Sequence, residues 1–256
     1  MGSFEGYIGV FDSGAGGISV LKALIDELPH ERFVFFGDSR YTPYGDKPAS
    51  WILDRCRHLT QWLLDEGCKA IVIACNTATS VAADTLRSEH PDVPIVGVEP
   101  ALKPAALAPH HRHILVMATN ATVHLDKFHK LAREYGSRSQ ITAIPCVGLA
   151  DCIEKGDFEG PELHGLLERL VGEYRGAVDS VVLGCTHYPF VKRQIAEVLG
   201  DVPFYDGSAG TARQTRRLLE GGMLAPESQQ GGVEFFSSNE GTRQIELYRW
   251  FLAQPI

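Results

Sequence analysis

The sequence predicts an α/β protein with two pseudosymmetric lobes, each a mainly parallel sheet flanked by helices, and a functional site in the cleft between them. Three observations carry this prediction. Short apolar runs alternate with stretches of helical periodicity almost from end to end. The runs are apolar throughout, as in strands that are buried on both faces. The alternation also begins again near the middle of the chain, with related motifs at a nearly constant offset.

The individual elements follow from hydrophobic periodicity. Ile71, Val72 and Ile73 are typical of a buried strand, whereas Leu21, Leu24 and Leu28 share one face of a helix. The predicted strands cover 7–11, 33–36, 70–74, 94–98, 114–117, 140–144, 180–184, 202–205 and 233–237. The predicted helices cover 18–28, 51–66, 80–89, 123–135, 162–174, 191–199, 211–219 and 242–252. Turn-forming residues predict loops at 37–48 and 220–232.

Two pairs of segments indicate an internal duplication. Residues 71–77 can be laid on 181–187 with a shift of 110, and 8–13 can be laid on 114–119 with a shift of 106. The tail after the second copy returns to a helix–strand–helix pattern. The predicted lobes are therefore 1–98 plus 208–256 for the first, and 99–207 for the second.

Length and composition limit the classes of function. The chain has 256 residues, of which 44% are hydrophobic and 22% are charged, which suits one large domain or two small ones. Its net charge of −8 gives no electrostatic reason to bind nucleic acid or an anionic membrane. No apolar run approaches the roughly 20 residues that span a bilayer, and the N-terminus lacks a signal-peptide pattern. We therefore expect a cytoplasmic protein with neither a nucleic-acid nor a membrane partner.

Cys75 and Cys185 stand at equivalent strand ends, one in each predicted lobe. In open parallel sheets, ligands bind outside the carboxyl ends of the strands. A following helix should place its positive dipole end near each sulfur and favour thiolate. Paired function and two merely buried thiols are both open at this point. The four cysteines expected to be small buried hydrophobes are Cys56, Cys68, Cys146 and Cys152.

The segment 12–17, DSGAGG, follows the first predicted strand. It could bind a dinucleotide, because Asp38 ends the second strand, where a ribose-binding acid can stand. Against this, Ser19 occupies the third glycine position of that fingerprint, and Asp12 would bring negative charge beside a phosphate. The alternatives are a helix N-cap made by Asp12 or Ser13, and a role for Asp12 beside a thiol while backbone amides hold a carboxylate.

Three further polar groups stand out. The segment 119–122, TNAT, matches the position of the glycine-rich loop in the second lobe and suits either helix capping or carboxylate binding. His187 follows Cys185 by two residues and could lower a thiol pKa or exchange protons with it. The run 109–113, PHHRH, could hold a metal, but it precedes a strand at an expected surface link. We therefore expect no metal site.

Four strings now resemble the glutamate racemases of the aspartate/glutamate racemase family. They are VFDSGAGG at 10–17, YTPYG at 41–45, IACNTAT at 73–79 and LGCTHYP at 183–189. They occur in the family's order and span nearly the whole chain. The resemblance implies a two-lobed isomerase that needs no cofactor, moves a proton at the α-carbon of glutamate and supplies D-glutamate for peptidoglycan.

The resemblance also implies roles for individual residues. Cys75 and Cys185 would be the two acid–base residues, and Glu154 would be an acid near the second thiol. The residues that would hold the substrate are Asp12, Ser13, Tyr44, Gly45, Asn76, Thr77, Thr119, Thr122, Thr186 and His187. Ala118 and Ala121 stand where the family often has glycine.

Two thiols in facing lobes suit this chemistry. To invert a carbon, a proton must leave one face and another must arrive at the opposite face, so two bases need only small movements. Asp12 and His187 could then relay protons, one beside each thiol. We expect a homodimer that takes free glutamate as a small-molecule substrate. An aspartate or hydantoin racemase, and a noncatalytic amino-acid- or nucleotide-binding module, stay open as alternatives.

Overall fold

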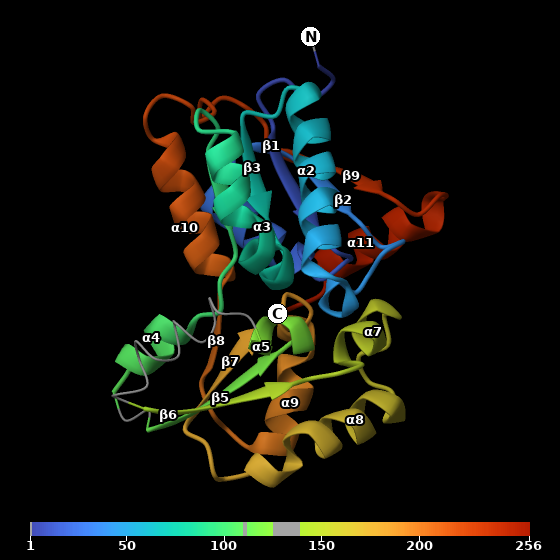
Figure 1. Ribbon diagram of the computed structural model, residues 1–256, viewed down its shortest axis with the longest axis vertical. Helices are drawn as coiled ribbons and strands as arrows, with labels where there is room; N and C mark the ends of the chain where they lie inside the picture. Colours follow the sequence, from blue (N-terminus) through green and yellow to red (C-terminus); the bar gives the residue numbers. More distant parts are fainter. Residues whose placement is uncertain (1, 110–111, 125–138) are drawn as a thin grey trace.

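The computed structural model describes residues 2–109, 112–124 and 139–256, which fold into two α/β lobes stacked along the long axis of the molecule (Figure 1). The described strands form two sheets, one of five strands and one of four. Every neighbouring pair of strands is parallel. Within these described ranges, no helix combines the length and the apolar character needed to cross a membrane.

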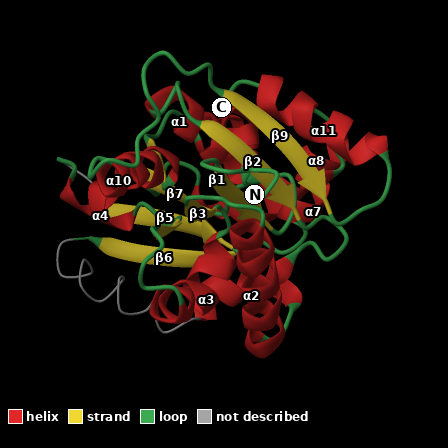
Figure 2. Ribbon diagram, turned by 90° about the horizontal axis from the view of Figure 1, so that it is seen from above, coloured by secondary structure: helices red, strands yellow, loops and turns green. Residues whose placement is uncertain are grey.

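The first sheet has helices on both of its faces. Its strands, in spatial order, are β4 (Ile95–Gly97), β3 (Ala70–Ile73), β1 (Ile8–Asp12), β2 (Arg32–Gly37) and β9 (Gly232–Ser237). One face is covered by α2 (Ala49–Asp65) and α3 (Asn76–Glu89), and the other by α1 (Ile18–Glu27), α10 (Ser208–Leu219) and α11 (Thr242–Ala253) (Figure 2). This arrangement explains why the strand sequences are apolar at consecutive positions: Ile71 and Ile73 pack on the side of α2 and α3, while Val72 packs on the side of α1.

The second sheet repeats the strand order of the first. Its strands are β8 (Phe204–Asp206), β7 (Ser180–Gly184), β5 (His113–Ala118) and β6 (Gln140–Pro145), and they match β4, β3, β1 and β2 in that order. The described helices of this lobe are α4 (Leu102–Leu107), α5 (Asn120–His124), α7 (Leu149–Glu154), α8 (Pro161–Val171) and α9 (Lys192–Leu199). The predicted two-lobe fold is therefore confirmed, and Cys75 and Cys185 follow the equivalent strands β3 and β7.

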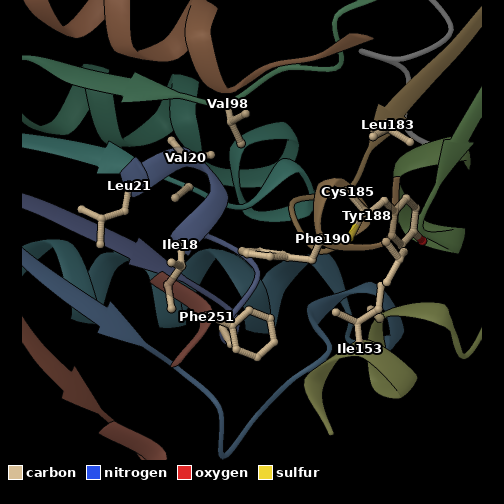
Figure 3. Close-up of a cluster of buried hydrophobic side chains, with 14 of the residues drawn as sticks. Ile18, Val20, Leu21, Val98, Ile153, Leu183, Cys185, Tyr188, Phe190 and Phe251 are labelled. Atoms are coloured by element: carbon tan, nitrogen blue, oxygen red, sulfur yellow. The ribbon is translucent and has the colours of Figure 1, made fainter. Parts of the chain in front are cut away.

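One apolar core runs from the first lobe into the second. Figure 3 shows Phe251, from the last helix, close to Phe190 of the second lobe. The centroids of these two rings lie 4.8 Å apart in an edge-to-face arrangement. Trp250 extends this contact to Phe158 of the second lobe at 4.9 Å. The tail of the chain therefore completes the first lobe and also packs against the second.

The predicted helices differ from the structure at the start of α3 and in two short helices that were missed. Helix α3 begins at Asn76 rather than at 80, because the Cys75 sulfur serves as the N-cap and accepts a hydrogen bond from the amide of Ala78 at 3.5 Å. Helices α4 and α7 were not predicted, since each has only six residues and shows too little periodicity. Of the helix predicted at 123–135, the structure describes the first turn as α5, and 125–138 lie outside the described residues.

The chain passes between the lobes at two neighbouring points. A Cβ added to Gly207 would lie 2.2 Å from the carbonyl oxygen of Glu99, so the two crossings are in close contact. We propose these crossings as the boundary between the lobe of residues 1–98 plus 208–256 and the lobe of residues 99–207. Only a residue without a side chain fits at Gly207, because the facing atom is backbone and cannot rotate away.

Candidate active site

A small cavity between the lobes is lined by both predicted thiols. Its volume is about 10 Å³, roughly the space needed for one water molecule. Its lining consists of Ser13, Pro43, Tyr44, Gly45, Cys75, Asn76, Thr77, Thr119, Ala150, Cys185, Thr186 and His187. This volume is too small for a free amino acid. A larger hollow of about 840 Å³ beside β4, β8, α4 and α10 contains none of the predicted site residues.

The predicted residues fall into two groups around this cavity. Most of them line it, whereas Asp12, Glu154 and Thr122 lie behind the lining. Sequence reasoning missed Pro43 and Ala150. Pro43 stands inside the YTPYG string and could have been found there. Ala150 shows no signal in the sequence, because a small apolar residue in a short helix is usually a packing residue.

Asp12 organises the glycine-rich loop from within. Its Oδ2 atom accepts hydrogen bonds from the amides of Gly14 at 3.0 Å and Gly17 at 2.9 Å. Neither Asp12 nor Ser13 caps α1, whose N-cap residue is Gly17 with no side-chain hydrogen bond. These loop amides already have an internal carboxylate, so they do not form the phosphate cradle of the dinucleotide hypothesis.

Glu154 and His187 bring the second lobe onto this loop. The Oε1 atom of Glu154 accepts hydrogen bonds from the amide of Ala15 at 2.5 Å and from His187 Nε2 at 2.7 Å. A Cβ on Gly14 would lie 2.0 Å from Glu154 Oε1, and one on Gly16 would lie 2.4 Å from His187 Nδ1. These glycines are therefore required by the close approach of side chains from the other lobe.

His187 connects the second thiol to Glu154. Its Nδ1 atom lies 3.5 Å from the sulfur of Cys185, while its Nε2 atom bonds to Glu154. Burial lowers the pKa of His187, but its hydrogen bonds and charge interactions with Cys185 and Glu154 outweigh burial and raise the pKa well above its usual value. A charged imidazole therefore lies directly beside the sulfur of Cys185 and can exchange a proton with it.

Cys75 has a different environment. Its thiol donates to Ser13 Oγ at 3.7 Å and its sulfur accepts from the amide of Ala78. Burial and then the negative charge of Asp12 raise the pKa of this thiol well above its usual value, although the amide and the serine act in the opposite direction. The helix-end amide of Ala78 therefore favours thiolate as expected, but burial and Asp12 outweigh its effect at Cys75. Along the chain, Cys185 is followed by the 3₁₀ turn η3 (Tyr188–Val191) rather than by the start of an α-helix.

Asp12 is a buried acid that titrates near neutrality. Burial raises its pKa to about 6, although the positive charge of His187 and the amides of Gly17 and Gly14 lower it. Its Oδ1 atom accepts from the hydroxyl of Thr186 at 3.5 Å. Asp12 can therefore hold or release a proton under physiological conditions, whereas an exposed aspartate is always ionised there.

Three threonine hydroxyls meet where the lobes face each other. Thr77 of the first lobe lies 3.0 Å from Thr119 and 3.4 Å from Thr122, and these two lie 2.9 Å apart. Gly45 packs against Thr119, since an added Cβ would lie 3.1 Å from the threonine Cβ. The hydroxyl of Thr119 also accepts from the amide of Thr122 at 3.3 Å. Because hydroxyl hydrogens rotate, this cluster can turn donors toward a carboxylate.

Tyr44 lines the cavity, but its hydroxyl points elsewhere. That hydroxyl donates to Asp38 Oδ2 at 2.5 Å, and Arg55 donates to both carboxylate oxygens of Asp38. Burial and the neighbouring Asp38 raise the pKa of Tyr44 far above its usual value. Asp38 is thus engaged by Tyr44 and Arg55 and cannot hold a ribose, which removes the second support of the dinucleotide hypothesis.

The four remaining cysteines do not line the cavity. Cys56, Cys68, Cys146 and Cys152 are buried free thiols, and burial raises the pKa of the first three to about 12. Residues 110–111 lie outside the described ranges. His113 bonds to the carbonyl of Ala177 and the hydroxyl of Thr142.

Comparison with known proteins decides the family. The Asp/Glu/Hydantoin racemase family model matches residues 19–215. A glutamate racemase of Clostridium perfringens is 43% identical over 243 residues, which cover 94% of each chain. The chain belongs to the Asp/Glu/Hydantoin racemase family.

Solved structures of this family share the fold. Glutamate racemase from Francisella tularensis, in complex with D-glutamate, has a TM-score of 0.84 and 27% identity, covering 99% of this chain and 96% of its own. The Escherichia coli glutamate racemase, in complex with L-glutamate and an activator, has a TM-score of 0.82 and 28% identity over 96% and 95% of the two chains.

Gly16→Ala should disturb the contact between the lobes. The new methyl would collide with the buried ring of His187, so we expect the free energy of unfolding to fall by about 1–3 kcal/mol, measured by urea denaturation. Gly210→Ala is the control. It lies in α10 with no atom within 4 Å of an added Cβ, so alanine should stabilise that helix by about 0.5–1 kcal/mol. A Gly16→Ala protein as stable as the parent would contradict the tight docking of His187.

Glu154→Gln should lower the pKa of His187, because it removes the negative charge next to Nε2. Protonated His187 stabilises the fold below the ordinary histidine pKa of about 6.5, and this contribution is lost as pH rises through the raised folded value. In Glu154→Gln, this stabilising contribution of His187 should be lost at a lower pH than in the parent protein. NMR titration of ¹⁵N-labelled histidines measures the change. Glu197→Gln, beside the exposed His164, should leave His187 unaffected. An unchanged His187 in Glu154→Gln would refute the assigned cause.

Proposed function

We propose that this chain is a glutamate racemase that interconverts L- and D-glutamate by proton transfer at the α-carbon, with Cys75 and Cys185 as its two acid–base residues. The observation that carries the proposal is the convergence of two thiols, from equivalent strands of two pseudosymmetric lobes, on one cavity. The negative charge of Cys185 also contributes to the raised pKa of Cys75, as expected for thiols that face each other.

The two thiols differ in a way that suits one direction of the reaction. The raised pKa of Cys75 keeps this thiol protonated at neutral pH, so it is ready to donate a proton. In the proposed mechanism the base is Cys185, whose sulfur lies 3.5 Å from Nδ1 of His187. Cys185 then takes the α-proton of L-glutamate while Cys75 protonates the opposite face. In the reverse direction Asp12, with a pKa of about 6, can accept the proton that Cys75 must lose.

Polar groups from both lobes hold the substrate in this proposal. The hydroxyls of Thr77, Thr119 and Thr122 receive a carboxylate of the substrate. Asn76 and Thr186 also line the cavity, and the hydroxyl of Thr186 donates to Asp12. Such donors also stabilise the carbanion-like state. The α-carbon is a far weaker acid than a thiol, and each unit of pKa mismatch costs about 1.4 kcal/mol, so fixed dipoles in a closed cavity must offset most of the difference.

The proposed reaction also implies a cellular role. D-Glutamate supplied by this chain would enter peptidoglycan synthesis, which maintains the cell wall and cell shape. We propose a cytoplasmic homodimer that needs no pyridoxal phosphate and takes free glutamate. Aspartate and hydantoin racemases share the family description. The identity of 43% to a named glutamate racemase over 94% of the chain favours glutamate over these substrates.

Serine at either thiol position tests the mechanism. Cys75→Ser and Cys185→Ser should each lower racemisation of glutamate by at least about 10³-fold, because a hydroxyl is too weak an acid to replace the thiol. The surviving thiol can still act on one enantiomer. Elimination from a glutamate analogue with a leaving group should therefore persist, with opposite enantiomer preferences in the two variants.

Cys68→Ser is the matched control, since Cys68 is buried away from the cavity and its replacement should affect stability only. Polarimetry follows racemisation, and circular dichroism checks the fold. Near-parental racemisation by a folded Cys75→Ser or Cys185→Ser protein would show that the two-thiol mechanism is wrong.

A further inference from the structure

The loop that forms one wall of the cavity is held from behind by helix α2. Pro43, Tyr44 and Gly45 line the cavity, and Gly45 meets Thr119 of the opposite lobe. The only regular structure in this loop is the 3₁₀ turn η1 (Tyr44–Asp46). Its position relative to the thiols therefore depends on side-chain contacts on the face that points away from the cavity.

A buried ion pair supplies the strongest of these contacts. Asp38 is completely buried, and Arg55 donates from Nε to Oδ2 at 2.8 Å and from Nη2 to Oδ1 at 2.7 Å. The same Oδ2 atom accepts the hydroxyl of Tyr44 at 2.5 Å. The carboxylate therefore links a helix residue to a loop residue. Because Asp38 has no contact with solvent, its charge depends on Arg55 for compensation.

Aromatic contacts from α2 complete the support. The guanidinium carbon of Arg55 lies 5.0 Å from the ring centroid of Tyr41. Trp51, one turn earlier on α2, packs against Tyr41 at 5.5 Å and edge-on against Tyr44 at 5.6 Å. Trp51 therefore contacts both Tyr41 and Tyr44, and Arg55 contacts Tyr41 directly and Tyr44 through Asp38. Neither Trp51 nor Arg55 lines the cavity.

We propose that Arg55 is a positioning residue of the active site, which acts through Asp38 and Tyr44 to fix the loop of residues 41–46 at the correct distance from the substrate. This proposal rests on the racemase function proposed above. It predicts that Arg55 affects substrate binding more than the proton-transfer step, because the loop forms a wall of the cavity while the thiols lie on other elements.

Arg55→Gln is the central variant, and Arg57→Gln is its matched control. Arg57 lies on the same helix and also forms a bidentate pair, but with Glu89 on α3, away from the loop. Because the loop forms a wall of the cavity, we expect the KM of Arg55→Gln for glutamate to rise about tenfold or more, which corresponds to about 1.4 kcal/mol or more of binding free energy. Its kcat should stay within about threefold of the parent value. Arg57→Gln should match the parent in both constants.

Two further variants keep the proposal testable if Arg55→Gln does not fold. Arg55→Lys keeps the charge but loses the bidentate geometry, so its KM should be intermediate. Tyr44→Phe removes only the hydroxyl and should raise KM. Its effect should not add to that of Arg55→Lys, since both act through the same carboxylate. A lower melting temperature for the Arg55 variants with unchanged KM would mean a purely structural role and would overturn the proposal.

Hydrogen exchange separates this proposal from the racemase function, because it needs no substrate. The amides of residues 39–47 should exchange faster in Arg55→Gln or Arg55→Lys than in the parent, with no such change in Arg57→Gln. A parent protein that fails to racemise glutamate refutes the proposed function. Unchanged exchange of the loop in the Arg55 variants refutes its positioning by Arg55.

Discussion

The structure depends on one contact, in which two side chains of the second lobe sit on the glycine-rich loop of the first. Glu154 accepts the amide of Ala15 and the imidazole of His187, while Asp12 binds the loop from the other side. Side chains at 14 or 16 would collide with these groups. This contact fixes the distance between the lobes, and with it the arrangement of two thiols that stand 110 residues apart in the sequence.

The same contact sets the electrostatics of the site. The loop and both lobes exclude solvent from Asp12 and His187, so each responds strongly to its few charged neighbours. Burial raises the pKa of Asp12 and Cys75, whereas Glu154 and Cys185 hold His187 in its charged form. The pseudosymmetric backbone therefore places its two thiols in different environments, since Asp12 acts on Cys75 while the charged imidazole of His187 lies 3.5 Å from Cys185. A two-base racemase needs this asymmetry, since one thiol must be an acid when the other is a base.

The sequence predicted what depends on local pattern. Apolar runs such as 70–74 identified strands buried on both faces, and the offset repeat brought Cys75 and Cys185 to equivalent strand ends. Contacts between distant residues could not be predicted. Arg55 stands 17 positions from Asp38, and no periodicity links them. Ala150 lines the cavity from a six-residue helix that shows no clear pattern. The early start of α3 depends on a cysteine as N-cap, and sulfur is not among the usual capping groups.

Proton transfer in D₂O tests the central claim most directly, namely that each face of the α-carbon meets its own thiol. L- and D-glutamate are converted separately to a small extent, and deuterium at the α-carbon is measured in substrate and product by mass spectrometry. Aspartate serves as the control substrate. Two bases predict one deuterium in the product and almost none in the remaining substrate, from either direction. Equal labelling of substrate and product at early times would mean that one base serves both faces, and would contradict the account.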